Sequence, residues 1–389
     1  MTSLAATRPD GATRATGPDG ATHATGPDGA TRATMPDGAG PATSAGRRTA
    51  ALRLAGSVAV AVALIGYVVP RVGGADWTSI GEALRHVGPA GLVLLALVWL
   101  AGLWVHTPAL TTAMPGLSHR RALQLNLTGS FVSNLLPLGG AAGTLANWSM
   151  ARAWGFTPSA FARWAILTNV ADLAVKLVMP ALALSWLAVA GVELGGSVSA
   201  AAYLGLGLLT LGALLAWLLA RDDRAARALG RLCDRLCRRI RPLASPPVPW
   251  SDRVAAMRAD CVSLVGSGWV VMVGAKLAYA ALQGVLLWLT LRLLGVSASP
   301  AVVLAAYAAE RILSLLVITP SAAGFVEAGM AGTLVALHAP AAPAVAAVLL
   351  YRAFVIGMEI PVGGAWLALW AVRRRRLSPG RVWSTPGPG

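Results

Sequence analysis

The stretch Glu310–Glu327, ERILSLLVITPSAAGFVE, is an apolar run with charged residues at both ends and a proline inside it. Proline removes a backbone donor and clashes with the preceding helical turn, and the small residues that follow Pro320 have little helix propensity. We therefore predict a helix that breaks inside a membrane, where protein or water must satisfy the freed backbone groups, as in many transporter sites. The alternative is two short helices joined by a surface loop. The candidate binding residues at this break are Glu310, Arg311, Pro320, Gly324 and Glu327.

The composition of the chain supports a membrane location. Of its 389 residues, 56% are hydrophobic and 12% are charged, whereas soluble domains carry about a quarter charged residues. The net charge is +16, and much of the excess lies in the non-apolar stretches 221–258 and 373–381. Basic stretches can bind nucleic acid, but beside membrane spans they mark the cytoplasmic side. We predict an all-α polytopic membrane protein without a nucleic-acid partner.

Motifs for metal binding or hydrolysis are absent from the sequence. It contains no HExxH, Walker loop or GxSxG elbow, and its five histidines are scattered. Its three cysteines provide no disulfide framework. We expect no catalytic residue, no metal site and no cofactor.

A second break is predicted after Leu135. Asn126, Ser130 and Asn134 lie on one helical face, which ends in a proline and several glycines. This pattern again indicates half a helix, a break and a second short half. The candidate binding residues here are Asn134, Pro137, Gly139 and Gly140.

The chain divides into three parts. Residues 1–46 repeat a nine-residue unit such as PDGATRATG and are expected to be a disordered cytoplasmic tail. Residues 47–372 form the transmembrane domain, and 373–389 a short basic tail. We predict seven to nine membrane segments in the plasma membrane, with both termini cytoplasmic. Besides the two broken hairpins, a first span is expected to end at Val69, and a polar connection at 71–88 follows it. Further spans are expected at 89–110, 161–190, 198–220, 262–294 and 341–372.

The basic stretch 221–258 contains an amphipathic segment. Leu229, Leu232, Leu236 and Ile240 lie on one face, and arginines cover much of the rest. Such a helix should lie along the inner membrane surface, attracted to anionic lipid. A solvated cytoplasmic helix is the alternative.

The order of segments suggests an inverted repeat. Each half reads span, broken hairpin and charged span, with the first hairpin entering from the inner side and the second from the outer side. Inverted repeats with paired discontinuous helices place a substrate site near the midplane.

Eight charged residues fall within or beside the apolar runs, where each should face protein or water. Their spacing predicts that Asp172 pairs with Lys176, and that Arg352 shares a helix face with Glu359. Such pairs either fix helix register or form part of a site. Lys276 has no local acid, so we expect a partner on another helix or a lipid phosphate, with snorkelling as the alternative. The eight candidates are Asp172, Lys176, Lys276, Glu310, Arg311, Glu327, Arg352 and Glu359.

At NLLPLGGAAG (134–143) and ITPSAAGFVEAG (318–329), the chain resembles the lysylphosphatidylglycerol synthase transmembrane family, also called flippase-like membrane proteins. The resemblance covers about 50–370. The family's second motif reads Pro-Gly-Gly-x-Gly-x-x-Glu, which Pro320, Gly324 and Glu327 match, whereas Ser321 and Ala322 replace the paired glycines. This departure argues against a backbone that needs positive φ at those two positions.

The resemblance implies a protein that moves a phospholipid or polyprenyl-linked lipid, with an anionic or polyprenyl-phosphate headgroup, between leaflets. The family's aminoacyl-lipid synthases carry an additional soluble catalytic domain, and only 17 residues follow Val372 here. We therefore expect a protein that is not an enzyme. The alternative function is a non-transporting partner that docks a glycosyltransferase or another lipid-modifying enzyme.

Overall fold

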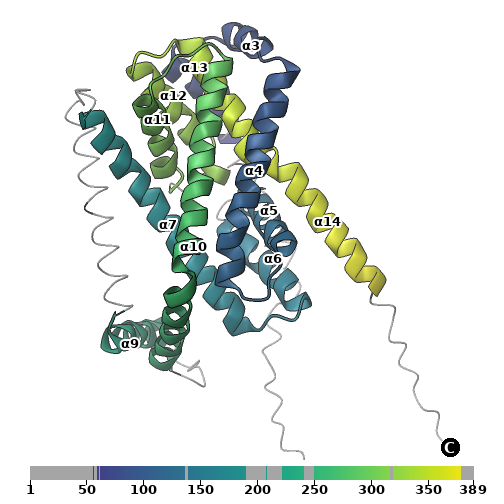
Figure 1. The fold of residues 1–389 in the computed structure, drawn as a ribbon, viewed down its shortest axis with the longest axis vertical. Coiled ribbons are helices and arrows are strands. Elements are labelled where there is room, and N and C mark those ends of the chain that lie inside the picture. Colours follow the sequence, from purple (N-terminus) through teal and green to yellow (C-terminus); the bar gives the residue numbers. More distant parts are fainter. Residues whose placement is uncertain are drawn as a thin grey trace, which may run out of the picture. The chain divides into compact units, whose positions relative to one another are not determined.

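A computed structural model describes residues 62–135, 139–189, 221–240, 249–315 and 319–377, together with residues 56, 59, 60 and 207. These residues form helices and turns without a strand, so the predicted all-α fold is confirmed for them (Figure 1). The tail 1–46, most of the span at 198–220 and the end of the basic tail lie outside the described residues. The elements, in which η1 and η3 are π-helical and η2 is a 3-10 turn, are η1 (Leu64–Val68), α2 (Val69–Gly73), α3 (Trp77–Arg85), α4 (Pro89–Ala113), α5 (His119–Leu135), α6 (Gly139–Ala153), α7 (Pro158–Val189), α9 (Asp223–Ile240), α10 (Trp250–Leu293), α11 (Pro300–Leu313), η2 (Pro320–Ala322), α12 (Phe325–Ala336), α13 (Ala341–Arg352), η3 (Ala353–Gly357) and α14 (Glu359–Leu377).

Within this described part, three helical stretches are long and apolar enough to cross a bilayer, which takes about 20 residues. They are Pro89–Ala113, Gly268–Leu293 and Ala341–Arg374. The first two, α4 and the later part of α10, pack along each other. Gly268 permits the close approach, because a Cβ there would lie 2.3 Å from Thr112 Cγ2.

The first predicted break is present in the α5–α6 hairpin. α5 ends at Leu135 and α6 begins at Gly139, and Pro137 lies outside the described residues. Small residues bring the two halves together, because a Cβ on Gly143 would lie 2.8 Å from the carbonyl oxygen of Gly129. The glycines after the break therefore serve helix packing as well as the break itself.

The second predicted break is present between α11 and α12, with the turn η2 at Pro320. The prediction about its backbone is wrong: Ser321 has φ 55° and Ala322 has φ 51°. Left-handed backbone costs about 1–2 kcal/mol for a residue with a Cβ. The surrounding contacts must therefore hold these two residues in a conformation that glycine adopts freely.

The two hairpins lie toward opposite ends of the helix bundle, and the second one contacts the first. Figure 1 shows α11 and α12 near the end that carries α3, and α5 and α6 toward the other end. The turn η2 contacts α5. α14 also packs on α5, where a Cβ on Gly363 would lie 2.1 Å from the carbonyl oxygen of Leu127.

The connection at 71–88, predicted to be a polar connection, contains the helix α3. This helix buries Ile80 and packs against α13.

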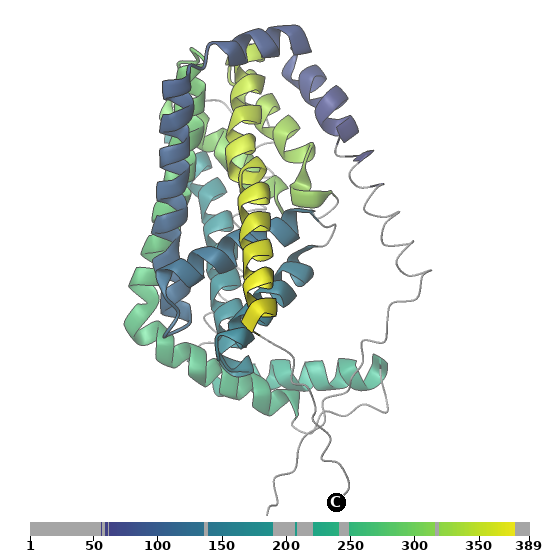
Figure 2. The ribbon, with the colours of Figure 1, turned by 90° about the vertical axis from the view of Figure 1, so that its right-hand side faces the viewer.

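The described part of the basic segment contains α9 and the first turns of α10. α10 begins at Trp250, before the predicted start of the span at 262–294. Asp234 on α9 caps α10, since its carboxylate accepts a hydrogen bond of 2.9 Å from the Trp250 backbone N–H. Asp223 pairs with Arg258. Figure 2 shows α9 lying across the end of the bundle. Leu229 and Leu232 are exposed on it, among arginines.

Candidate functional site

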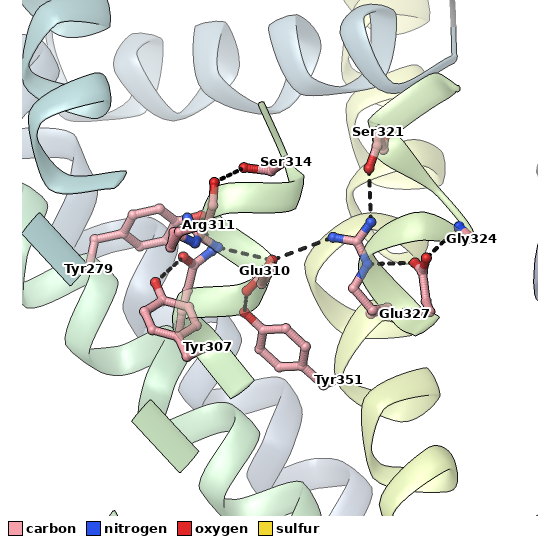
Figure 3. Close-up of polar contacts among 11 residues, drawn as sticks. Tyr279, Tyr307, Glu310, Arg311, Ser314, Ser321, Gly324, Glu327 and Tyr351 are labelled. Atoms are coloured by element: carbon pink, nitrogen blue, oxygen red, sulfur yellow. Dashed lines mark hydrogen bonds and ion pairs between the residues drawn. The ribbon is translucent and has the colours of Figure 1, made fainter. Parts of the chain in front are cut away.

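Arg352, the last residue of α13, binds three other segments through one buried guanidinium group (Figure 3). Its Nε donates to Glu327 Oε1 on α12 at 2.6 Å, and its Nη1 lies 3.4 Å from Glu310 Oε1 on α11. Its Nη2 donates to the carbonyl oxygen of Ser321 in η2 at 3.0 Å. The second oxygen of Glu327 accepts a 2.5 Å hydrogen bond from the Gly324 N–H and so caps α12. These contacts tie the break to the end of α13.

Glu310 is shared between two arginines. Besides Arg352, it binds Arg311 Nη2 at 2.9 Å, and the Tyr351 hydroxyl donates to its second oxygen at 2.7 Å. The Glu310 side chain is 2% exposed. A buried carboxylate is stable only when such donors satisfy its oxygens.

A chain of polar contacts continues from Arg311 toward α10 (Figure 3). The Arg311 guanidinium lies 4.6 Å from the centre of the Tyr307 ring. The Tyr307 hydroxyl donates to Gln283 Oε1 at 3.0 Å, and Gln283 Nε2 donates to the Tyr279 hydroxyl at 2.9 Å. The polar cluster therefore extends from α13 through α11 to α10.

A separate ion pair lies where α4, α7 and α10 approach one another. Lys276 Nζ pairs with Asp172 and lies 3.3 Å from His106 Nε2. The His106 ring stacks on Tyr279, with centroids 4.7 Å apart. Because an ammonium group can only donate, His106 Nε2 must be the acceptor in this contact. The predicted pairing of Asp172 with Lys176 is therefore wrong, and the expected partner of Lys276 on another helix is Asp172.

The face predicted to be shared by Arg352 and Glu359 does not produce an ion pair between them in the described part of the chain, although the charge of Arg352 acts on Glu359. The π-helical turn η3 separates the two residues along the chain. Arg352 turns to Glu310 and Glu327, whereas the buried Glu359 forms a side-chain hydrogen bond with Ser130 on α5.

The remaining candidates lie near the hairpin tips. Asn134 is half-buried in the last turn of α5, and at the start of α6 Gly139 is buried and Gly140 exposed. Gly324 has φ 88°, and a Cβ there would lie 2.2 Å from Leu64 Cβ. Its role is thus to let η1 pack against the break, rather than to leave space for a ligand.

The chain matches the model of the lysylphosphatidylglycerol synthase TM region over residues 54–363. The chain belongs to this family. The matched region includes both hairpins and all eight charged candidates, and together with the apolar helices it identifies a transmembrane protein. A comparison with curated proteins finds no significant match.

Within this lysylphosphatidylglycerol synthase TM region, sequence reasoning missed His106, Tyr307 and Tyr351. Each is buried and takes part in the polar cluster. Their position in the sequence could have identified them, because a histidine or tyrosine inside an apolar run needs a polar partner when it is buried. In the described part of the chain, no group of three His, Cys, Asp or Glu side chains is placed to hold a metal ion.

The TM region also contains an apolar pocket of about 480 Å³ between α4, α5 and α14. Trp99 and Trp104 line it from α4, Leu127 from α5, and Trp366 from α14. Two of these helices belong to the candidate spans, so the pocket lies at membrane depth. Its lining suits a hydrocarbon chain.

Proposed function

We propose that this protein moves a lipid between the two leaflets of its membrane by guiding the polar headgroup past the two hairpin tips. The observation that supports this best is the contact of η2 with α5 beside a buried cluster of charged side chains. Discontinuous helices at such a point offer backbone and side-chain partners to a polar group.

The physical reason is the cost of taking a headgroup through hydrocarbon. Charged groups in the bilayer centre cost several kcal/mol unless they face protein or water. A cluster of acids, arginines and tyrosines provides both charges and hydrogen-bond partners along such a route, and the pocket between α4, α5 and α14 suits the lipid's apolar chain.

We further propose an inverted repeat of seven to nine membrane segments in the plasma membrane. Both termini and the segment 221–258 would be cytoplasmic, with 1–46 as a tail and 47–372 as the transmembrane domain. The lipid carries an anionic or polyprenyl-phosphate headgroup, and the protein moves it without a catalytic step.

Purified protein in vesicles tests the proposal. Fluorescent lipid in the inner leaflet should become accessible to an external quencher faster than in protein-free vesicles. Gly140→Leu adds bulk at the first hairpin tip, where a Cβ would meet nothing within 4 Å, and should slow transport without preventing folding.

Gly274→Leu on α10 is the matched control, because its Cβ also has open space. It should transport as the wild type does. If wild-type protein never exceeds protein-free vesicles across anionic and polyprenyl-phosphate lipids, transport is refuted. The remaining role is then that of a partner for a glycosyltransferase or another lipid-modifying enzyme.

A further inference from the structure

Among the described residues, the ion pairs of the charged cluster leave out one base, Lys176, and one acid, Glu359. Asp172 pairs with Lys276, Glu327 with Arg352, and Glu310 with both Arg311 and Arg352. Lys176 on α7 remains. Among the described residues it has neither an ion pair nor a hydrogen bond, although its side chain is partly buried in the bundle. A cation in this position needs an anion, since burying an uncompensated charge is unfavourable.

Arg311 is the charged group that acts most strongly on Lys176. α7 packs against α11, and the charges of Lys176 and Arg311 act on each other. Arg311 uses Nη2 for Glu310, but its Nε is buried without a hydrogen-bond partner. Two like charges that act on each other are unfavourable unless an anion compensates them, and both side chains have donors to offer to such an anion.

The other charged groups that act on Lys176 do not form an ion pair with it. Asp172 and Glu310 attract it, yet both carboxylates are already paired with other bases, and Lys276 repels it. Lys276 itself is a poor candidate for a ligand site, because its side chain is 2% exposed and its charge is compensated by Asp172. Lys176 is the more accessible of the two lysines.

We propose that Lys176 and Arg311 form a binding site for the phosphate group of a lipid headgroup. A planar guanidinium and a flexible ammonium together match the several acceptor oxygens of phosphate. The assignment to a lipid rests on the proposed function, whereas phosphate binding itself does not require transport.

Thermal unfolding in neutral detergent tests the site with dihexanoyl phosphatidylglycerol as the probe. The probe should raise the melting temperature of the wild type, and Lys176→Met should need at least tenfold more probe for the same rise. Lys176→Arg should retain the response. Arg292→Met, which removes an exposed cation at the end of α10, is the matched control and should respond as the wild type does.

Two further probes separate the sources of the effect. Dihexanoylglycerol has the same chains without phosphate, and an equal rise with it would overturn the proposal. Inorganic phosphate tests the free ion: a response to phosphatidylglycerol that phosphate does not reproduce supports a lipid headgroup, whereas a response to phosphate alone refutes the lipid assignment.

Ligand-free Lys176→Met gives a second, independent result. Its melting temperature should equal or exceed that of the wild type, because the substitution removes an uncompensated charge. A clear fall in melting temperature would show that Lys176 has a structural partner and would overturn the site.

The failure of the site and the failure of the proposed function can be told apart. Wild-type protein that binds the probe but moves no lipid would refute the proposed function and leave the site intact. Transport by the wild type together with unchanged probe binding by Lys176→Met would refute the phosphate site and leave the proposed function intact.

Discussion

At the scale of single residues, Arg352 holds the broken hairpin in place. Its planar guanidinium reaches Glu327, Glu310 and the Ser321 carbonyl in three directions, which a lysine ammonium on its flexible stem cannot reproduce with the same geometry. Removing one member of such a buried cluster leaves the others without compensation, at a cost of about 3–5 kcal/mol. The hydrogen bond from Arg352 to the Ser321 carbonyl oxygen is thus one of the contacts that hold the left-handed backbone there.

The pairing of Asp172 gives a prediction for a double-mutant cycle. Asp172→Asn should destabilise the protein, because it leaves Lys276 buried without an acid. Adding Lys276→Met should restore most of the lost stability, whereas adding Lys176→Met should not. Unfolding of the purified variants in detergent measures the difference. Rescue by Lys176→Met in place of Lys276→Met would contradict the observed pairing.

The strained turn gives a second prediction. Ser321→Gly with Ala322→Gly should stabilise the protein by about 1 kcal/mol, because relief of left-handed strain exceeds the entropy that glycine adds to the unfolded chain. Ala328→Gly, in the regular helix α12, is the control and should destabilise by about 1 kcal/mol. Equal destabilisation by both changes in chemical unfolding would show that the turn is not strained.

At the scale of helices, glycine determines which elements can touch. A Cβ on Gly363 of α14 would lie 2.1 Å from the Leu127 carbonyl oxygen on α5, which leaves no space for a side chain. Gly363→Ala should therefore force the two helices apart and cost about 1–3 kcal/mol. Gly274→Ala on α10 has open space and should be neutral or stabilising. Comparable melting temperatures for the two variants would contradict this packing.

At the scale of the whole molecule, the hairpins and loops divide between two ends of the bundle. Because α4 and α10 run antiparallel, the loop before α5 and the loop before α11 lie at opposite ends (Figure 1). With basic stretches inside, Ser118 should face the cytoplasm and Ser297 the exterior.

Cysteine labelling checks this arrangement in intact cells, after Cys233, Cys237 and Cys261 are replaced by serine. A membrane-impermeant thiol reagent should label Ser297→Cys, whereas Ser118→Cys should react only after the cells are opened. Both serines are exposed, so a difference between them reports sidedness and not burial. Labelling of both positions from outside would refute the opposed arrangement.

The sequence by itself determined the all-α membrane fold, the two helix breaks and the family. Each of these follows from properties of neighbouring residues: apolar runs of sufficient length, Pro320 with small residues after it, and glycines after Leu135. Such local rules act along the chain, so they can be read without knowing which helices meet.

Only the tertiary structure decided the partners of the charged residues and the conformation of the break. Sequence spacing favoured Asp172 with Lys176, but a helical pair of this kind contributes about 0.2–0.5 kcal/mol. Leaving Lys276 buried without its acid would cost several times more. The positive φ of Ser321 likewise depends on Arg352, which is distant in the chain. Contacts between distant segments outweigh local preference here, because burial makes an unsatisfied charge more costly than a strained residue or an unused local pair.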